Sequence, residues 1–324
     1  PNITINGAGS SYILSTALIS SGNLTLNAGT FNTNNLAMTL LTLSVGASGV
    51  RTMTLGSSAI TLTSANFAFS FGNLTNLTFT ANTAVLTCTG AVVSFNNIVV
   101  MNSFNWNGLS IVITAAQAAT VNISGATIRN LTITGTAIKT TEFRFNGGFT
   151  ITGTLTVNGN SATNRVLLAT SSRGTAATLT VATLGTMSNV DMMDITAAGS
   201  SAPWNIAAIT GLSGNAGGNT NITFTTGVTS YLCSTISASW SSNIWFSATG
   251  GGGSATRVPL PQDDVILDSS SSPTASRVIT IDMPRAGKNI TTSGNTNGSS
   301  IIASSTTEIY GTWTNTDNTW GNSL

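Results

Sequence analysis

The chain has few charged residues and no histidine. Of its 324 residues only 6% are Asp, Glu, Lys or Arg, and no carboxylate precedes Glu142. Ordinary soluble proteins carry about 25% charged residues. The formal net charge is +1, so the composition indicates no electrostatic attraction for nucleic acid and no membrane partner. Without histidine, this sequence contains neither a Ser-His-Asp triad nor a histidine-based metal centre.

Cysteine and long apolar runs are also scarce. Cys88 and Cys233 lie 145 residues apart, which favours two small buried hydrophobic residues over a disulfide or a zinc site. No run approaches the roughly 20 apolar residues that insertion across a membrane requires. The first residues, PNITINGAGS, contain neither an initiator methionine nor a signal-peptide pattern. We therefore expect a processed or cropped piece of a longer chain.

Helical patterns are nearly absent, and period-two alternation replaces them. Leu, Ile, Val or Phe alternate with Thr in stretches such as NITIN, GNLTLNAGTF, RTMTLGSSAITLT and FTITGTLTV. Gly and Asn separate these stretches. Alternation of this kind, rich in β-branched residues, is typical of β-strands.

The strands recur at a regular spacing. An Asn followed by an aliphatic residue opens runs of alternation, and the intervals Asn2 to Asn23 and Asn76 to Asn97 are both 21 residues, with 25 from Asn97 to Asn122. We predict an all-β, right-handed parallel β-helix (β-solenoid) with coils of about 20–25 residues. Such stacking also explains the scarcity of charged residues. Like charges at the same outward position of successive coils would lie roughly 5 Å apart, which is destabilising.

Tandem β-sandwiches are the alternative fold. Asn-Gly dipeptides are the usual mark of antiparallel hairpins. They occur at Asn6, Asn107, Asn146, Asn158 and Asn297. The regular interval favours the solenoid over the sandwiches.

The segment VPLPQDDVILD, residues 258–268, differs from its surroundings. It contains two of the chain's six prolines, followed by three of its nine acidic residues. It is a candidate for a catalytic cluster, a metal site or the join between two structural units. Asp263 or Asp264 is expected to accept backbone N–H groups there, as Asp commonly does in turns.

Residues 240 to 290 contain a characteristic series of elements, namely Trp240 and Trp245, Gly250 to Gly253, Pro261, Asp263 and Asp264, and Val278 to Asp282. With this series they resemble the opening of a repeat unit of large virion-associated proteins of tailed bacteriophages, which is related to repeats of secreted bacterial surface proteins. The stretch GNLTLNAGTFNTNNLAMTLLTLSV resembles the body of the same unit. The resemblance implies a fibre-like or decorating role on a particle or cell surface and supplies no catalytic motif. On this resemblance, residues 1–229 are the body of one unit and residues 230–324 begin a second, with a connecting loop at 240–262 and strands from 263. The segment VPLPQDDVILD is then the join between the two units.

Two groups of residues are candidates for binding. Trp240, Trp245 and Phe246 could stack on a host glycan, although core burial is the commoner fate of such tryptophans. Asp263, Asp264 and Asp268 could hold Ca²⁺ through carboxylate and backbone oxygens, although solvated turn aspartates are the simpler interpretation. No other cofactor is expected.

Paired carboxylates could also hydrolyse glycosides. The candidates are Asp191 with Asp194, and Asp263 with Asp264 or Asp268. Residues three apart or adjacent on a strand point to opposite faces, so we expect no catalytic pair and no enzyme.

The sequence thus predicts a non-enzymatic structural protein of a virion or surface fibre, most simply a phage tail, fibre or decoration element. Its partners would be other virion or surface proteins and further copies of itself. Its place would be the virion surface or the extracellular face of a cell. A host-glycan-binding adhesin is the alternative, followed by a polysaccharide depolymerase.

Overall fold

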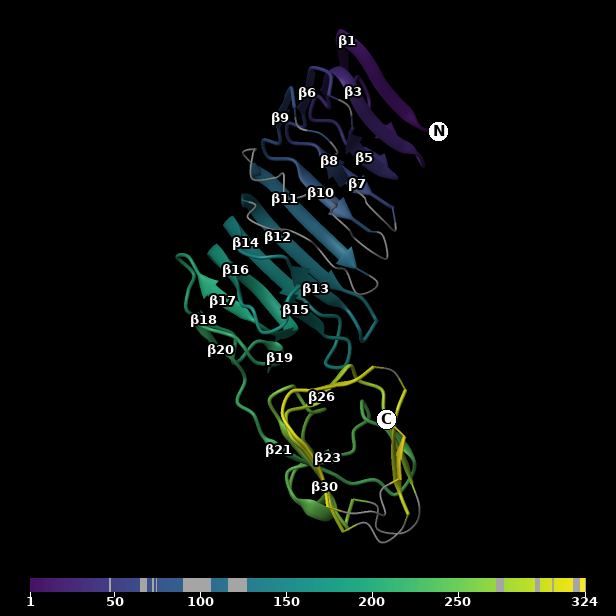
Figure 1. Cartoon of the computed structure of the whole chain (residues 1–324), viewed down its shortest axis with the longest axis vertical. Helices are drawn as coiled ribbons and strands as arrows, with labels where there is room; N and C mark the ends of the chain where they lie inside the picture. Colours follow the sequence, from purple (N-terminus) through teal and green to yellow (C-terminus); the bar gives the residue numbers. More distant parts are fainter. Residues whose placement is uncertain are drawn as a thin grey trace.

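A computed structural model describes residues 1–46, 48–64, 69–71, 73, 75–89, 106–115, 127–271, 277–294, 298–304, 306–316 and 321–323. Within these ranges the chain is all-β and forms a parallel β-solenoid of about 11 turns (Figure 1). The described residues contain one short 3-10 turn, η2 (Thr249–Gly251). The predicted fold is confirmed. Asn97, Asn122 and Asn297, which entered the sequence argument, lie outside the described residues.

Two sheets run along the first unit. The first joins β1 (Ile3–Ile13), β3 (Asn23–Asn32), β5 (Thr42–Val45), β6 (Arg51–Thr54), β8 (Phe69–Phe71) and β9 (Leu77–Thr80). The second joins β2 (Leu18–Ile19), β4 (Met38–Leu40), β7 (Ala59–Leu62), β10 (Val85–Cys88), β11 (Trp106–Ala115), β12 (Thr127–Gly135), β13 (Glu142–Phe145), β14 (Phe149–Asn158), β15 (Val166–Thr170), β16 (Ala177–Met192), β17 (Ile195–Ala198) and β19 (Thr210–Asn215). A short pair, β18 (Trp204–Asn205) and β20 (Ile222–Thr223), closes the unit.

The second unit has three shorter sheets. One contains β21 (Thr229–Leu232), β23 (Trp245–Phe246), β24 (Asp264–Leu267), β27 (Ile290–Thr292) and β30 (Trp313–Asn315). Another contains β22 (Ala238–Ser239), β25 (Val278–Ile281), β28 (Ser300–Ala303) and β31 (Gly321–Ser323), and the third pairs β26 (Arg285–Gly287) with β29 (Glu308–Ile309). Among the described strands, β21 with β23 is the one antiparallel pair.

The register reproduces the spacing expected from sequence. Ile3 pairs with Leu24, 21 residues later, and Met38 pairs with Ile60, 22 residues later. Inward positions form apolar ladders, and outward positions form polar ones. Thr25 and Ser44 stack on the outer face, for example, with their hydroxyl oxygens 2.9 Å apart.

Asn side chains tie successive coils together at the corners. The Oδ1 of Asn2 accepts the backbone N–H of Asn23 at 3.0 Å, and the Oδ1 of Asn23 accepts the hydroxyl of Thr42 at 2.8 Å. In the second unit Asn289 accepts the N–H of Thr312 at 3.0 Å. These bonds join polar groups of successive coils without using charged residues.

Each unit has its own hydrophobic core. One cluster of buried residues extends from Ile5 to Ile206, and a second extends from Leu232 to Ile301. Figure 1 shows the coils of the first unit from the side and those of the second unit end-on. The solenoid axis therefore turns between the units, and one side of the second unit rests against the last coils of the first.

Candidate functional site at the junction between the two units

The tryptophans proposed as a glycan platform lie in the core of the second unit. Trp240 is 0% exposed and Trp245 is 1% exposed. Their rings meet edge to face with centroids 4.6 Å apart. The indole N–H of Trp240 donates to the carbonyl of Ala286, and that of Trp245 donates to the carbonyl of Trp240. The stacking prediction for this pair is wrong, because both rings are buried and both N–H groups are satisfied within the unit.

Phe246 stands at the edge of that core. It is half-buried on β23, where it pairs with Tyr231 of β21. The predicted surface of three rings is therefore not formed, and the cross-strand neighbour of Phe246 is Tyr231.

Asp263 holds the start of the second unit together. It is fully buried, and its carboxylate accepts the N–H groups of Val228 at 2.9 Å and Leu260 at 2.8 Å. The guanidinium of Arg257 pairs with it at 2.7 Å. Burial nevertheless raises the pKa of Asp263 above its usual range. The prediction that an aspartate here accepts backbone N–H groups is confirmed.

The other two aspartates of the predicted calcium site have separate partners. Asp264 is exposed and accepts the side-chain amide of Asn289 at 2.7 Å. Asp268 accepts the N–H of Ser270 at 2.9 Å and the hydroxyl of Thr249. No group of three or more Asp, Glu or Cys side chains in the described ranges could hold a metal ion. The three aspartates are therefore not assembled into a calcium site.

Asp191 and Asp194 are also separated, but not for the reason expected from sequence. Asp191 lies in β16, whereas Asp194 follows the strand in a left-handed conformation with φ of 56°. Strand alternation therefore does not apply to Asp194. The two carboxylates have different partners: Asp191 accepts the side chains of Arg165 and Arg285, and Asp194 accepts the N–H of Gly174.

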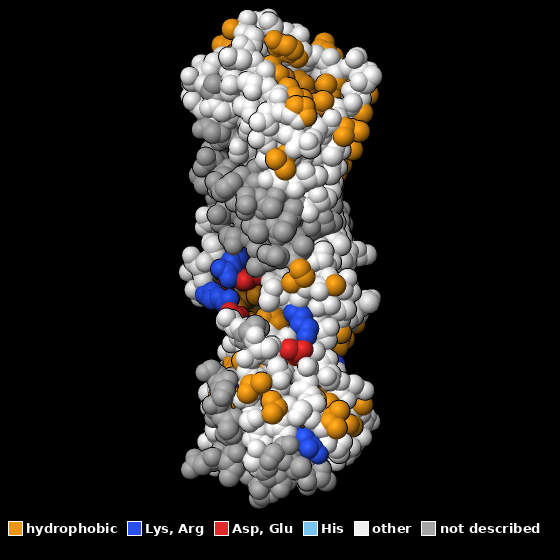
Figure 2. Space-filling view, turned by 90° about the vertical axis from the view of Figure 1, so that its right-hand side faces the viewer, with side chains coloured by type: hydrophobic (Ala, Val, Ile, Leu, Met, Phe, Trp, Pro, Cys, Tyr) orange, Lys and Arg blue, Asp and Glu red, His pale blue; other side chains and the backbone are white. Residues whose placement is uncertain are grey.

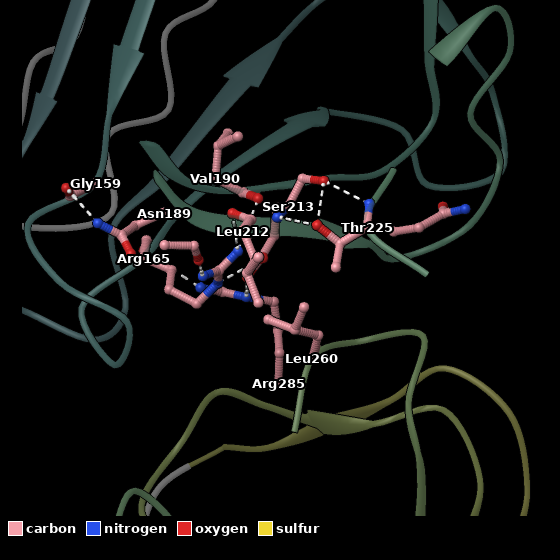
Figure 3. A network of polar contacts seen from close by, with 12 residues as sticks. Gly159, Arg165, Asn189, Val190, Leu212, Ser213, Thr225, Leu260 and Arg285 are labelled. Atoms are coloured by element: carbon pink, nitrogen blue, oxygen red, sulfur yellow. Dashed lines mark hydrogen bonds and ion pairs between the residues drawn. The ribbon is translucent and has the colours of Figure 1, made fainter. Parts of the chain in front are cut away.

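Asp191 forms the centre of a buried ion-pair triad at the junction. Its Oδ1 accepts the Nε–H of Arg165 at 2.7 Å, and its Oδ2 accepts the Nε–H of Arg285 at 2.6 Å. Arg165 belongs to the first unit and Arg285, on β26, to the second. The exposed fractions of the three side chains are 1%, 3% and 5% for Asp191, Arg165 and Arg285. Figure 3 shows the two arginines converging from opposite sides of the junction.

The triad fixes the charge state of Asp191. Burial alone would raise the pKa of this carboxyl group, but the guanidinium groups of Arg165 and Arg285 outweigh burial and hold the pKa below its usual range. A buried carboxylate with two cationic partners stays ionised, and removal of one member leaves an uncompensated buried charge.

The last coil of the first unit is shaped around Arg165. Its guanidinium also donates to the carbonyls of Gly211 at 2.6 Å and Leu212 at 3.1 Å. Both residues have left-handed backbone conformations, with φ of 68° and 64°. This conformation is unusual for leucine, and the charge-assisted hydrogen bonds hold it in place.

Gly214 leaves room for the triad. It lies beside Asp191 in the register between β16 and β19. A Cβ atom at this position would lie 2.1 Å from the Oδ1 of Asp191 and 2.7 Å from Pro261 of the second unit. Glycine is therefore needed where the two units meet.

Gln262, in the segment VPLPQDDVILD, joins the two units with one amide group. Its Nε2 donates to the carbonyls of Ser213 at 2.9 Å and Thr225 at 2.8 Å, and its Oε1 accepts the N–H of Asn215 at 2.8 Å. The segment that stood out in the sequence thus bonds in two directions: Gln262 bonds to Ser213, Asn215 and Thr225 of the first unit, and Asp263 bonds to the chain around it through Val228, Arg257 and Leu260.

Further charged pairs surround the triad. Arg173 of the first unit pairs with Glu308 of β29 at 2.5 Å, and Lys139 pairs with Asp282. These pairs are partly exposed, so each adds about 0–1 kcal/mol. Figure 2 shows Lys, Arg, Asp and Glu side chains gathered at the waist of the molecule, where the units meet.

A small apolar cluster completes the junction. It consists of Leu167, Ala169, Met193 and Ala216 of the first unit, against which Tyr310 of the second unit packs. The hydroxyl of Tyr310 donates to Glu308 at 2.7 Å. Beside Tyr310 lies an open cleft of about 520 Å³.

Sequence reasoning missed the residues that build this junction, namely Arg165, Arg285, Gln262 and Tyr310. The available signal was the distribution of charge, because residues 1–128 contain one charged side chain and the other charges lie between 129 and 317. Cys88 and Cys233 are not joined by a disulfide; Cys88 is buried as predicted, whereas Cys233 is half-buried. Burial raises the pKa of the Cys88 thiol to about 12.

No family model matches the chain, and neither a curated protein nor a solved structure matches it. No helix among the described residues has the length and apolar character to cross a membrane.

Proposed function

We propose that the chain is a non-enzymatic structural protein of a virion or surface fibre, in which solenoid units hold other surface elements at a defined distance and angle. A phage tail, fibre or decoration protein fits this role best. Its partners would be other virion or surface proteins and further copies of the chain. The observation that carries the proposal is the buried Arg165–Asp191–Arg285 triad, which supports a fixed junction between two solenoid units.

The energetics of a solenoid suit this role. Stability is the sum of the contacts between neighbouring coils, so length can be added without a larger core. The coils are joined by backbone ladders and Asn side chains, and the surface of the first coils is nearly free of charge. Such a surface presents few lysines and arginines to trypsin-like proteases.

A glycan-binding adhesin is the alternative function, but its predicted platform is part of the core. Replacing Trp245 with alanine separates the two functions. We expect Trp245→Ala to destabilise the second unit by about 3–5 kcal/mol, as large-to-small core substitutions do. Hydrogen exchange would rise in residues 229–316 and stay unchanged in the first unit. Loss of binding to host cells with unchanged exchange would instead favour the adhesin.

Immunogold electron microscopy of the source material tests the proposed location. Label at regular positions on phage tails, fibres or capsids would support the virion assignment. Label on cell envelopes or free filaments would place the same structural role on a cell surface. Label confined to the cell interior would contradict both locations.

A further inference from the structure

The cleft beside Tyr310 is formed by both units. Arg173, Met193 and Asp194 contribute from the first unit, together with Gly217 and Gly218, and Glu308 and Tyr310 contribute from the second. Its volume is about 520 Å³, which is within the range of small-molecule sites. The cleft exists only when the two units are docked.

Asp194 is the unusual residue of this cleft. It is 6% exposed, and its Oδ2 accepts the N–H of Gly174 at 2.7 Å. The other fully buried aspartates of the described residues, Asp191 and Asp263, each pair with arginine. Asp194 has no Lys or Arg partner among the ion pairs of the described residues. A cation from outside the chain would therefore add the ion pair that Asp191 and Asp263 already have.

The rest of the cleft has the same preference. Glu308 adds a second carboxylate, and its charge is balanced by Arg173, which leaves the net charge of Asp194 in the cleft. The ring of Tyr310 provides a face that attracts cations. Its position is fixed, because the ring packs on the apolar cluster and its hydroxyl is bonded to Glu308.

From this arrangement we propose that the junction cleft binds an organic ammonium group, with Asp194 as its counter-ion and Tyr310 as its aromatic wall. The ammonium could be carried by an amino sugar or by a lysine side chain. This site is additional to the structural role and does not depend on the proposed location.

Nuclear magnetic resonance titration of the full chain tests the site. The probes are D-glucosamine, its uncharged counterpart N-acetyl-D-glucosamine, and Nα-acetyl-L-lysine methylamide. We expect at least one of the two ammonium probes to shift the backbone N–H signals of Gly217 and Gly218. The acetylated sugar should bind about 10-fold more weakly, since charge-assisted hydrogen bonds are about twice as strong as neutral ones. The first and third probes distinguish an amino sugar from a lysine side chain.

Asp194→Asn is the matched variant. Asparagine adopts left-handed conformations readily, and its side-chain oxygen can still accept the N–H of Gly174, so the fold is retained while the charge is lost. We expect the affinity for the ammonium probe to fall about 10-fold. Asp264→Asn, which removes an exposed carboxylate elsewhere, should leave it unchanged.

Any one of three results would contradict the proposed site. The first is that neither ammonium probe shifts the N–H signals of Gly217 and Gly218. The second is that N-acetyl-D-glucosamine binds the unmodified chain as tightly as D-glucosamine does, and the third is that Asp194→Asn binds the ammonium probe as tightly as the unmodified chain does. The second comparison needs no variant, so it holds even if Asp194→Asn alters the fold.

Discussion

The amino-terminal coils and the junction between the units differ most in their use of charge. Residues 1–128 contain one charged side chain, Arg51, which is fully buried and donates to the carbonyls of Gly49, Asn73 and Thr75. The junction, in contrast, is held by ion pairs such as Arg285–Asp191 and Arg173–Glu308.

The difference follows from repetition. In stacked coils the same outward position recurs about every 4.8 Å. A charged residue that is repeated at this position therefore lies next to a residue of the same charge and is repelled by it. Threonine and asparagine avoid this repulsion and still form hydrogen bonds. At the junction two unlike surfaces meet once, and opposite charges can face each other. Charge therefore contributes to how the units dock, whereas neutral ladders build the amino-terminal coils.

Removal of the central carboxylate of the triad should have the largest effect. Asp191→Ala leaves Arg165 and Arg285 buried without a counter-ion, and we expect a loss of about 3–5 kcal/mol in the free energy of unfolding. Urea unfolding followed by hydrogen exchange measures the loss and locates it. Asp264→Ala, at an exposed carboxylate, is the control and should change stability by less than about 0.5 kcal/mol. Equal effects of the two variants would show that the triad does not hold the junction.

Acid should weaken the same contact more gradually. The pKa of Asp191 is lower in the folded protein than its ordinary value, so its ionised form stabilises the fold above about pH 3.9. This stabilisation is lost as the pH falls through that value toward the lowered pKa of the folded state. The pKa of Asp263 is raised in the folded protein, so the contribution of Asp263 to the free energy of unfolding decreases as the pH rises.

Comparison with Asp191→Asn isolates the contribution of Asp191 to the pH dependence. The difference in thermal stability between the two proteins should be constant from pH 7 to pH 5 and then shrink on further acidification. A difference that stays the same down to pH 2 would contradict the assigned charge state.

A smaller effect is expected when charge is introduced into the neutral ladder. Thr61 and Thr87 occupy the same outward position on β7 and β10. We expect the double variant Thr61→Lys with Thr87→Lys to lose more free energy of unfolding than the two single variants lose together. The excess should be about 0.2–1 kcal/mol, because the two ammonium groups are neighbours. Thr61→Lys with Thr87→Glu is the matched control and should show the opposite sign of coupling. A double-mutant cycle in thermal unfolding measures both, and added salt should reduce both.

The fold could be predicted from the sequence because a solenoid repeats its local pattern. The alternation in GNLTLNAGTF indicates strands, and the interval from Asn2 to Asn23 gives the length of a coil; each pattern is local to one or two coils. The role of Asp263 at a turn was equally local.

The junction could not be predicted in the same way. Arg285 meets Asp191 from 94 residues away, and this contact depends on how one unit docks on the other, which no periodic pattern contains. The tryptophans were misassigned for a related reason. A Trp pair beside a glycine-rich loop has the same sequence whether it lies inside the unit or on its surface, and burial is decided by the neighbouring coils.

The turn of the solenoid axis between the units has a geometric consequence. If further units followed with the same docking, each would be rotated against the one before, and the assembly would wind into a superhelix. Its end-to-end reach would then grow more slowly than its contour length. Corresponding faces of successive units would point outward in a regular angular sequence. The docking surface around Asp191 would thereby set the pitch of such an assembly.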